Sequence, residues 1–132
     1  MQFIQRKLKL TSLENGASGE SRSVIHNQIQ FWQERQLPQE QDLLHLVNKV
    51  LRNQKQLGTA KLLVHCLDGC TRSGLFLAVF NILQRMDAVG NIHIPWGILT
   101  IRETQKRFVK DVDQLRYCHL IVLKYLELEN RY

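Results

Sequence analysis

Cysteine, proline and long apolar runs are all scarce in this sequence of 132 residues. Its three cysteines are an odd number without the spacing of a disulfide framework, which favours reduced thiols and an intracellular setting. No apolar run is long enough to cross a bilayer, and the amino terminus lacks the continuous hydrophobic region of a signal peptide. The sequence predicts a soluble cytoplasmic piece, and a fragment of a larger membrane protein would look the same.

Metal-ligand spacing is missing as well. Cys66 and Cys70 are close together in the sequence, but a zinc site needs four ligands and no second close pair accompanies them. The histidines have no ligand spacing either. We therefore expect no metal site.

What the sequence does have is enough apolar content for a core and an excess of positive charge. It is 44% hydrophobic and 23% charged, which predicts a single domain over residues 1–132. The formal charge of +6 fits an anionic partner. Because the basic residues are scattered rather than clustered, we expect no nucleic-acid partner and no direct membrane contact.

The hydrophobic pattern predicts an α/β domain. Alternating residues predict a hairpin from residues 3–13 and 21–31, and a short apolar run predicts a buried strand over residues 60–65. The helical pattern predicts four helices, which cover residues 39–57, 73–86, 95–108 and 111–130. In the last helix the predicted buried stripe consists of Leu115, Cys118, Val122, Tyr125 and Leu126.

The stretch VHCLDGCTRSG, residues 64–74, joins the predicted strand to a helix. Such a loop directs backbone N–H groups and the positive end of the helix at one point, which favours a bound phosphate. Arg72 can bind two phosphate oxygens at once, and Cys66 lies where the same N–H groups would stabilise a thiolate nucleophile. The phosphate-binding residues are predicted to be Cys66, Leu67, Asp68, Gly69, Cys70, Thr71 and Arg72.

This stretch resembles the Cys-x5-Arg signature of the protein tyrosine phosphatases, His-Cys-x-x-Gly-x-x-Arg-Ser/Thr-Gly. The fixed positions are matched by His65, Cys66, Gly69, Arg72, Ser73 and Gly74. The resemblance implies that Cys66 attacks phosphorus, that Arg72 binds the phosphoryl oxygens, and that Ser73 helps the thiolate to leave. It also implies that the His65 side chain turns inward and tunes the thiolate, and that no metal or cofactor takes part.

The resemblance extends over essentially the whole chain, as the C-terminal half of a phosphatase domain that is incomplete at its N-terminus. Residues 29–38 resemble the movable loop that carries the general acid, and Glu34 is the candidate acid there. Residues 108–127 resemble the closing segment that positions the hydrolytic water. Gln114 keeps one of its two glutamines, whereas Lys110 replaces the other. The implied fold has a central mixed sheet flanked by helices, with the phosphate-binding loop between a strand and a helix.

Several of these residues have a second interpretation. Glu34 can be the acid or a solvated loop carboxylate, and Gln114 can position water or be an amide on a helix surface. Asp68 can place a repelling charge inside the anion loop or only cap local N–H groups in a turn. Lys110 has no acceptor with which to orient a water molecule. Cys70 and Cys118 are interpreted as packing residues.

Two main functions therefore stand beside each other, in addition to an interpretation in which the same chemistry acts on a phosphoinositide or an RNA 5′-phosphate. The first is a tyrosine phosphatase domain, most similar to a receptor-type second domain, that hydrolyses phosphotyrosine in a protein or peptide through a cysteinyl-phosphate. The alternative is a catalytically impaired pseudophosphatase that binds a phosphopeptide or another phosphatase domain. A cytoplasmic location, as the intracellular part of a membrane receptor, fits both.

Overall fold

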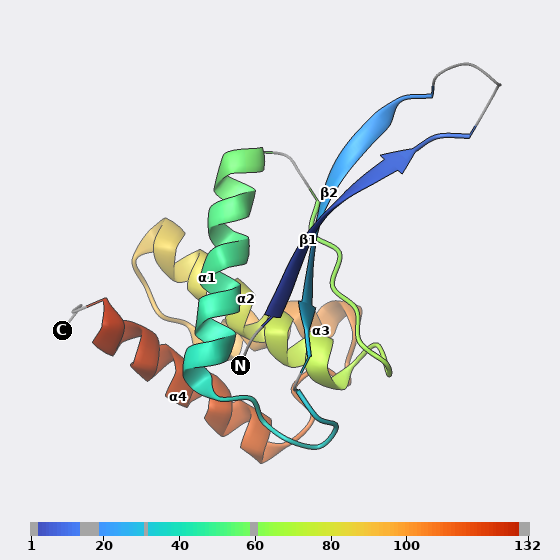
Figure 1. Ribbon diagram of the computed structural model, residues 1–132. Coiled ribbons are helices and arrows are strands. Elements are labelled where there is room, and N and C mark those ends of the chain that lie inside the picture. The colour runs from blue at the N-terminus through green and yellow to red at the C-terminus, as the bar shows by residue number, and fades with distance from the viewer. Residues whose placement is uncertain (1–2, 14–18, 31, 59–60, 130–132) are drawn as a thin grey trace. The chain divides into compact units, whose positions relative to one another are not determined.

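The computed structural model describes residues 3–13, 19–30, 32–58 and 61–129. Within these ranges two strands precede four helices (Figure 1): β1 (Phe3–Thr11), β2 (Ser21–Ile29), α1 (Glu40–Leu57), α2 (Thr71–Val89), α3 (Ile94–Thr104) and α4 (Val112–Leu128). The predicted α/β class is confirmed. The chain forms two compact units, Met1–Gln36 and Leu37–Tyr132. In the described part of the chain, no helix combines the length and apolarity that a membrane crossing needs.

The first unit contains the predicted hairpin. β1 and β2 pair antiparallel from Phe3 opposite Ile29 to Thr11 opposite Ser21. Side chains that lie opposite each other on the two strands also bond: Gln5 Nε2 donates to Asn27 Oδ1 at 2.9 Å. Residues 14–18 of the predicted connection lie outside the described residues.

The second unit begins with α1, whose ends follow the sequence closely. Glu40 and Asp42 stand in its first turn, where negative charge is favourable to the helix dipole. Gly58 ends the helix with a φ of 64° and donates its N–H to Gln54 at 3.0 Å. A positive φ is available to glycine without steric cost, so the predicted end of this helix is confirmed.

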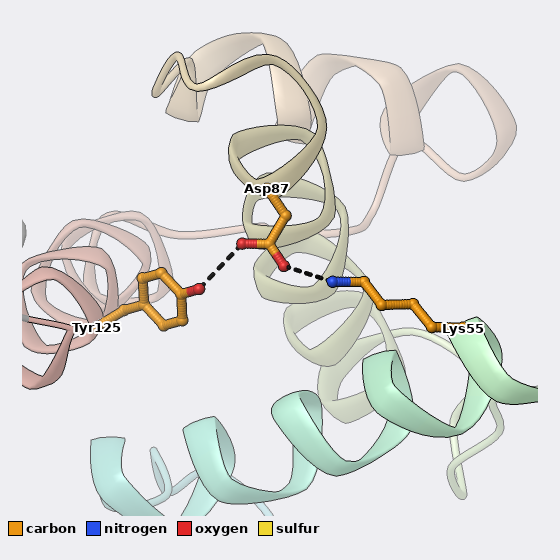
Figure 2. Close-up of polar contacts among 3 residues, drawn as sticks. All are labelled: Lys55, Asp87 and Tyr125. Carbon is orange, nitrogen blue, oxygen red and sulfur yellow. Dashed lines mark hydrogen bonds and ion pairs between the residues drawn. The ribbon is translucent and has the colours of Figure 1, made fainter.

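α2 lies at the centre of the second unit and contacts the other three helices. Its apolar residues face several neighbours at once, as the continuous apolar sequence predicts. Figure 2 shows how one polar residue of α2 connects to two of these neighbours: Asp87 accepts a hydrogen bond from the Tyr125 hydroxyl of α4 at 3.0 Å and pairs with Lys55 Nζ of α1 at 3.3 Å. The core of the second unit is apolar. Its most buried side chains are Leu43, Leu44, Val47, Leu75, Val79, Leu83, Cys118 and Ile121.

α3 is shorter than predicted. It ends at Thr104 rather than continuing to Phe108, because the chain turns and buries Phe108 and Val109. Arg102 Nη1 holds this turn by donating to the Val109 carbonyl oxygen at 3.2 Å. The turn brings Phe108 against Gly74 of α2, where a Cβ atom would lie 2.6 Å from the Phe108 ring. Gly74 therefore lets the turn before α4 pack closely against α2.

α4 buries a face that is rotated from the predicted stripe. Leu115 is 39% exposed and Leu126 is only half-buried, whereas Gln114 is 5% exposed. The reason is that α4 packs against both α1 and α2. Its buried residues are Gln114, Tyr117, Cys118, Ile121, Val122 and Tyr125.

The prediction of a buried strand before the loop is wrong for this structure. Residues 61–65 belong to no strand, and Leu63 is 87% exposed. The described strands β1 and β2 pair with each other only, so the segment has no described backbone partner. An apolar run indicates a capacity for burial, but a strand also needs a neighbour to bond with.

Candidate active site

The loop around Cys66 leads directly into α2. Gly69 takes a φ of 64°, a left-handed conformation that other residues rarely adopt. Cys70 is the residue before the helix, and Gly74 N–H donates to its carbonyl oxygen at 2.8 Å to close the first turn. The loop therefore reverses the chain so that the start of α2 lies beside Cys66.

Cys66 and Ser73 contact each other across this loop. The Cys66 sulfur lies 3.1 Å from the Ser73 hydroxyl oxygen, and the Ser73 backbone N–H donates to it at 3.4 Å. Ser73 is 4% exposed, so its hydroxyl is held in place by the packing of the helix. Both groups can stabilise negative charge on the sulfur.

Asp68 turns its carboxylate into the loop and accepts hydrogen bonds from three neighbouring residues. Its Oδ1 accepts the backbone N–H groups of Cys70 at 3.0 Å and Thr71 at 2.9 Å, and it lies 3.1 Å from the Cys66 sulfur, which donates to it as a thiol. Its other oxygen accepts the Thr71 hydroxyl. The Thr71 hydroxyl first, and then the Cys66 thiol and the two N–H groups, hold the pKa of Asp68 well below its usual range. Asp68 therefore caps the helix and also places a charge beside Cys66.

The remaining loop residues differ in burial. Arg72 and Thr71 are half-buried in the first turn of α2, and Cys70 is 3% exposed. Leu67 is 86% exposed, so only its backbone can contribute to the loop. The prediction that His65 turns inward is wrong, because its side chain is exposed on the unpaired segment that precedes the loop. Its role in tuning the thiolate stays a prediction.

The other two cysteines behave as packing residues. Cys118 is fully buried in α4, and this burial raises the pKa of its thiol to about 12. Cys70 is also buried, whereas Cys66 is half-buried. All three are free thiols. Cys66 is thus the most accessible of the three.

Gln114 is buried rather than on a helix surface, so that interpretation of it was wrong. Its side-chain Oε1 accepts the Lys110 backbone N–H at 2.9 Å, and its own backbone N–H donates to the Asp111 carboxylate at 2.9 Å. These bonds fix the start of α4. Its side-chain nitrogen takes no part in them, and its role in positioning water stays a prediction.

Glu34 belongs to the first unit and is exposed. It lies in a turn where Gln36 N–H donates to the Gln33 carbonyl oxygen at 3.3 Å and Trp32 Nε1 donates to the Gln36 carbonyl oxygen at 2.9 Å. Its neighbour Arg35 takes a φ of 66°. This turn lies within residues 29–38, the segment that resembles the movable loop. The role of Glu34 as an acid stays a prediction.

Sequence reasoning missed two contributors to the loop. Thr71 was named only as part of the phosphate cradle, but its hydroxyl and N–H both hold Asp68. A signal was present for Asp68, because Asp side chains in turns commonly bond to the backbone two residues further on. For Phe108 no local pattern indicates the contact with Gly74, because it joins distant parts of the chain.

The chain matches the family model for protein-tyrosine phosphatase over residues 1–124. This chain belongs to the protein-tyrosine phosphatase family. The predicted resemblance is confirmed. The family implies phosphotyrosine substrates in general.

The relatives of this phosphatase domain are receptor-type enzymes by name. It is 27% identical over 130 residues to the human (Homo sapiens) receptor-type tyrosine-protein phosphatase epsilon. The aligned part covers 96% of this chain and 19% of that protein. It is 28% identical over 127 residues to receptor-type tyrosine-protein phosphatase F of zebrafish (Danio rerio). The aligned part covers 95% of this chain and 6% of that protein. The chain therefore spans about a fifth or less of these relatives.

Proposed function

We propose that this domain hydrolyses phosphotyrosine in proteins or peptides through a phosphate bound covalently to Cys66. The observation that carries the proposal is the pair of Ser73 contacts with the Cys66 sulfur, 3.1 Å from the hydroxyl oxygen and 3.4 Å from the backbone nitrogen. A sulfur that attacks phosphorus and later leaves it must carry negative charge twice. Donors already in contact with it lower the cost of both steps.

The proposed reaction has two steps. The Cys66 thiolate attacks phosphorus, so that an S–P bond forms as the ester P–O bond breaks and Glu34 gives its proton to the leaving tyrosine oxygen. Water then attacks the phosphorus and gives a proton to Glu34, while the S–P bond breaks and the Ser73 hydroxyl donates to the departing thiolate. Arg72 binds the phosphoryl oxygens throughout, which requires no metal ion.

The test is the turnover of para-nitrophenyl phosphate by the chain and by matched variants. We expect Cys66→Ser to abolish turnover, because an alcohol is not ionised at neutral pH. We expect Ser73→Ala to slow the release of phosphate by about tenfold or more, since one donor to the leaving sulfur is lost. Ser23→Ala is the control for a lost hydroxyl, because Ser23 is exposed on β2. Turnover that survives in Cys66→Ser contradicts the proposal.

The second candidate is a pseudophosphatase that binds a phosphopeptide or another phosphatase domain without turnover. The observation that favours it is the Asp68 carboxylate, which accepts two loop N–H groups and lies 3.1 Å from the Cys66 sulfur. The deciding result has two parts. The wild type binds tungstate, and neither the wild type nor Asp68→Ala turns over the aryl phosphate.

We also propose a cytoplasmic location, as the intracellular part of a membrane receptor. Its support is that all three cysteines are free thiols and that the relatives carry receptor-type in their names. A protease-protection assay on intact cells tests the proposal. Digestion of the domain from outside the cell contradicts it.

A further inference from the structure

The carboxylate of Asp68 occupies the place where a phosphate would find donors. Two backbone N–H groups of the loop, those of Cys70 and Thr71, point at the same Asp68 oxygen at 3.0 and 2.9 Å. The Cys66 sulfur, the proposed nucleophile, lies 3.1 Å from that oxygen. An oxyanion that reached Cys66 would require negative oxygen atoms in the same region.

We propose that Asp68 is an internal competitor for the phosphate site: a phosphate binds only when the Asp68 carboxylate swings out of the loop. The proposal rests on the proposed function, because it assumes that the loop accepts phosphate. It makes Asp68 the residue that sets how strongly this loop binds its substrate, separately from the residues that carry the chemistry.

Charge and hydrogen bonding act in the same direction here. The four hydrogen bonds to Asp68 keep its pKa well below the usual range, so the carboxylate is charged at neutral pH. A phosphate dianion entering beside it is repelled, and a dianion that displaces it must replace bonds that are already satisfied. The capping N–H groups are therefore not available to a substrate while Asp68 stays in place.

The structure also permits the movement. The Asp68 side chain is exposed, and its neighbours Leu67 and Gly69 are exposed as well, so it can leave the loop without opening the core. Within the described part of the chain, the contacts to Asp68 that must break are those of Cys66, Cys70 and Thr71. A side-chain rotation into solvent is sufficient.

The experiment titrates tungstate, a phosphate-like oxyanion, into the chain and three variants by calorimetry. Asp68→Asn removes the charge and leaves an oxygen on the N–H groups, whereas Asp68→Ala removes both. We expect tungstate to bind Asp68→Asn about tenfold more tightly than wild type, and Asp68→Ala at least as tightly as that. Asp113→Asn is the control for a lost charge, because Asp113 is 77% exposed and its ion pair with Arg116, at 3.6 Å, lies on the surface. Its affinity should stay within about twofold of wild type.

A second readout does not depend on bound oxyanion. Iodoacetamide alkylates the thiolate of Cys66, and the Asp68 carboxylate accepts a hydrogen bond from the Cys66 thiol and repels a thiolate. Alkylation at pH 7 should therefore be faster in Asp68→Asn than in wild type and unchanged in Asp113→Asn. Thermal unfolding confirms that each variant is folded before it is compared.

The outcomes separate the two proposals. Equal tungstate affinity in wild type and both Asp68 variants overturns the competitor proposal and leaves the proposed function standing. Failure of every folded variant to bind tungstate overturns both, because the loop is then not a phosphate site.

Discussion

Replacing Gly74 with alanine tests the packing that holds the loop onto α2. Gly74 lies in the first turn of the helix, one residue after Ser73. An alanine Cβ there would lie 2.6 Å from Cδ1, 2.9 Å from Cγ and 3.1 Å from Cα of Phe108. The last of these atoms is backbone, so a rotation of the ring alone cannot relieve the clash.

The expected cost follows from two opposing effects. An extra methyl group in a packed site costs about 1–3 kcal/mol, and alanine is favoured over glycine inside a helix by about 1 kcal/mol. Because the Cβ would lie under 3.0 Å from two ring atoms and 3.1 Å from a backbone atom, the clash should cost about 2–3 kcal/mol, the upper part of that range. The net loss should then be roughly 1–2 kcal/mol. For a chain of this length, that corresponds to a fall in Tm of roughly 4–8 °C.

The assay is thermal unfolding followed by circular dichroism, with tungstate binding measured on the same samples. Gly90→Asn is the control, because Gly90 has open space around it and its φ of 72° is one that asparagine tolerates. Phe108→Leu should recover part of the loss when combined with Gly74→Ala, because the two residues touch. An unchanged or higher Tm for Gly74→Ala refutes the reasoning.

Two further predictions concern stability. Asp68→Ala should lower the free energy of unfolding by about 1 kcal/mol at pH 7 through loss of the α2 cap. Because its hydrogen bonds hold the folded pKa of Asp68 well below its ordinary 3.8, this contribution is complete above about pH 5, declines as the pH falls below about 4, and is lost only as the pH falls through the folded pKa, so the urea curves of the two proteins should approach each other in acid. Tyr125→Phe should cost about 1 kcal/mol in the same assay by leaving Asp87 without its 3.0 Å bond. Lys55→Met should cost less than about 1 kcal/mol because the Lys55 side chain is 69% exposed; a larger effect of Lys55→Met than of Tyr125→Phe contradicts this ranking.

The elements that the sequence predicted well are those with local causes. The α1 end at Gly58 follows from a residue that accepts positive φ, and the hairpin follows from alternation on both sides of a polar connection. What local patterns could not supply were the contacts between distant segments. The strand expected over residues 60–65 needs a partner, and the end of α3 at Thr104 depends on the burial of Phe108.

The loop shows the same division. The sequence located Cys66, Arg72 and Ser73 because the signature fixes their spacing, and the Ser73 contact with the Cys66 sulfur agrees with that spacing. It left two interpretations of Asp68 open, because the direction of one side chain depends on the backbone around it. The structure shows that Asp68 caps the helix and that its charge also lies inside the loop.

The most direct test of the central claim is to look for phosphate on Cys66 itself. The chain is mixed with an aryl phosphate, quenched in acid within the first turnover, digested, and the peptide that contains Cys66 is weighed by mass spectrometry. We predict a phosphate group on Cys66 in wild type, more of it in Asp68→Asn, and none in Cys66→Ser. Turnover without phosphate on Cys66, or a Cys66 that takes up no phosphate in either wild type or Asp68→Asn, would contradict the claim.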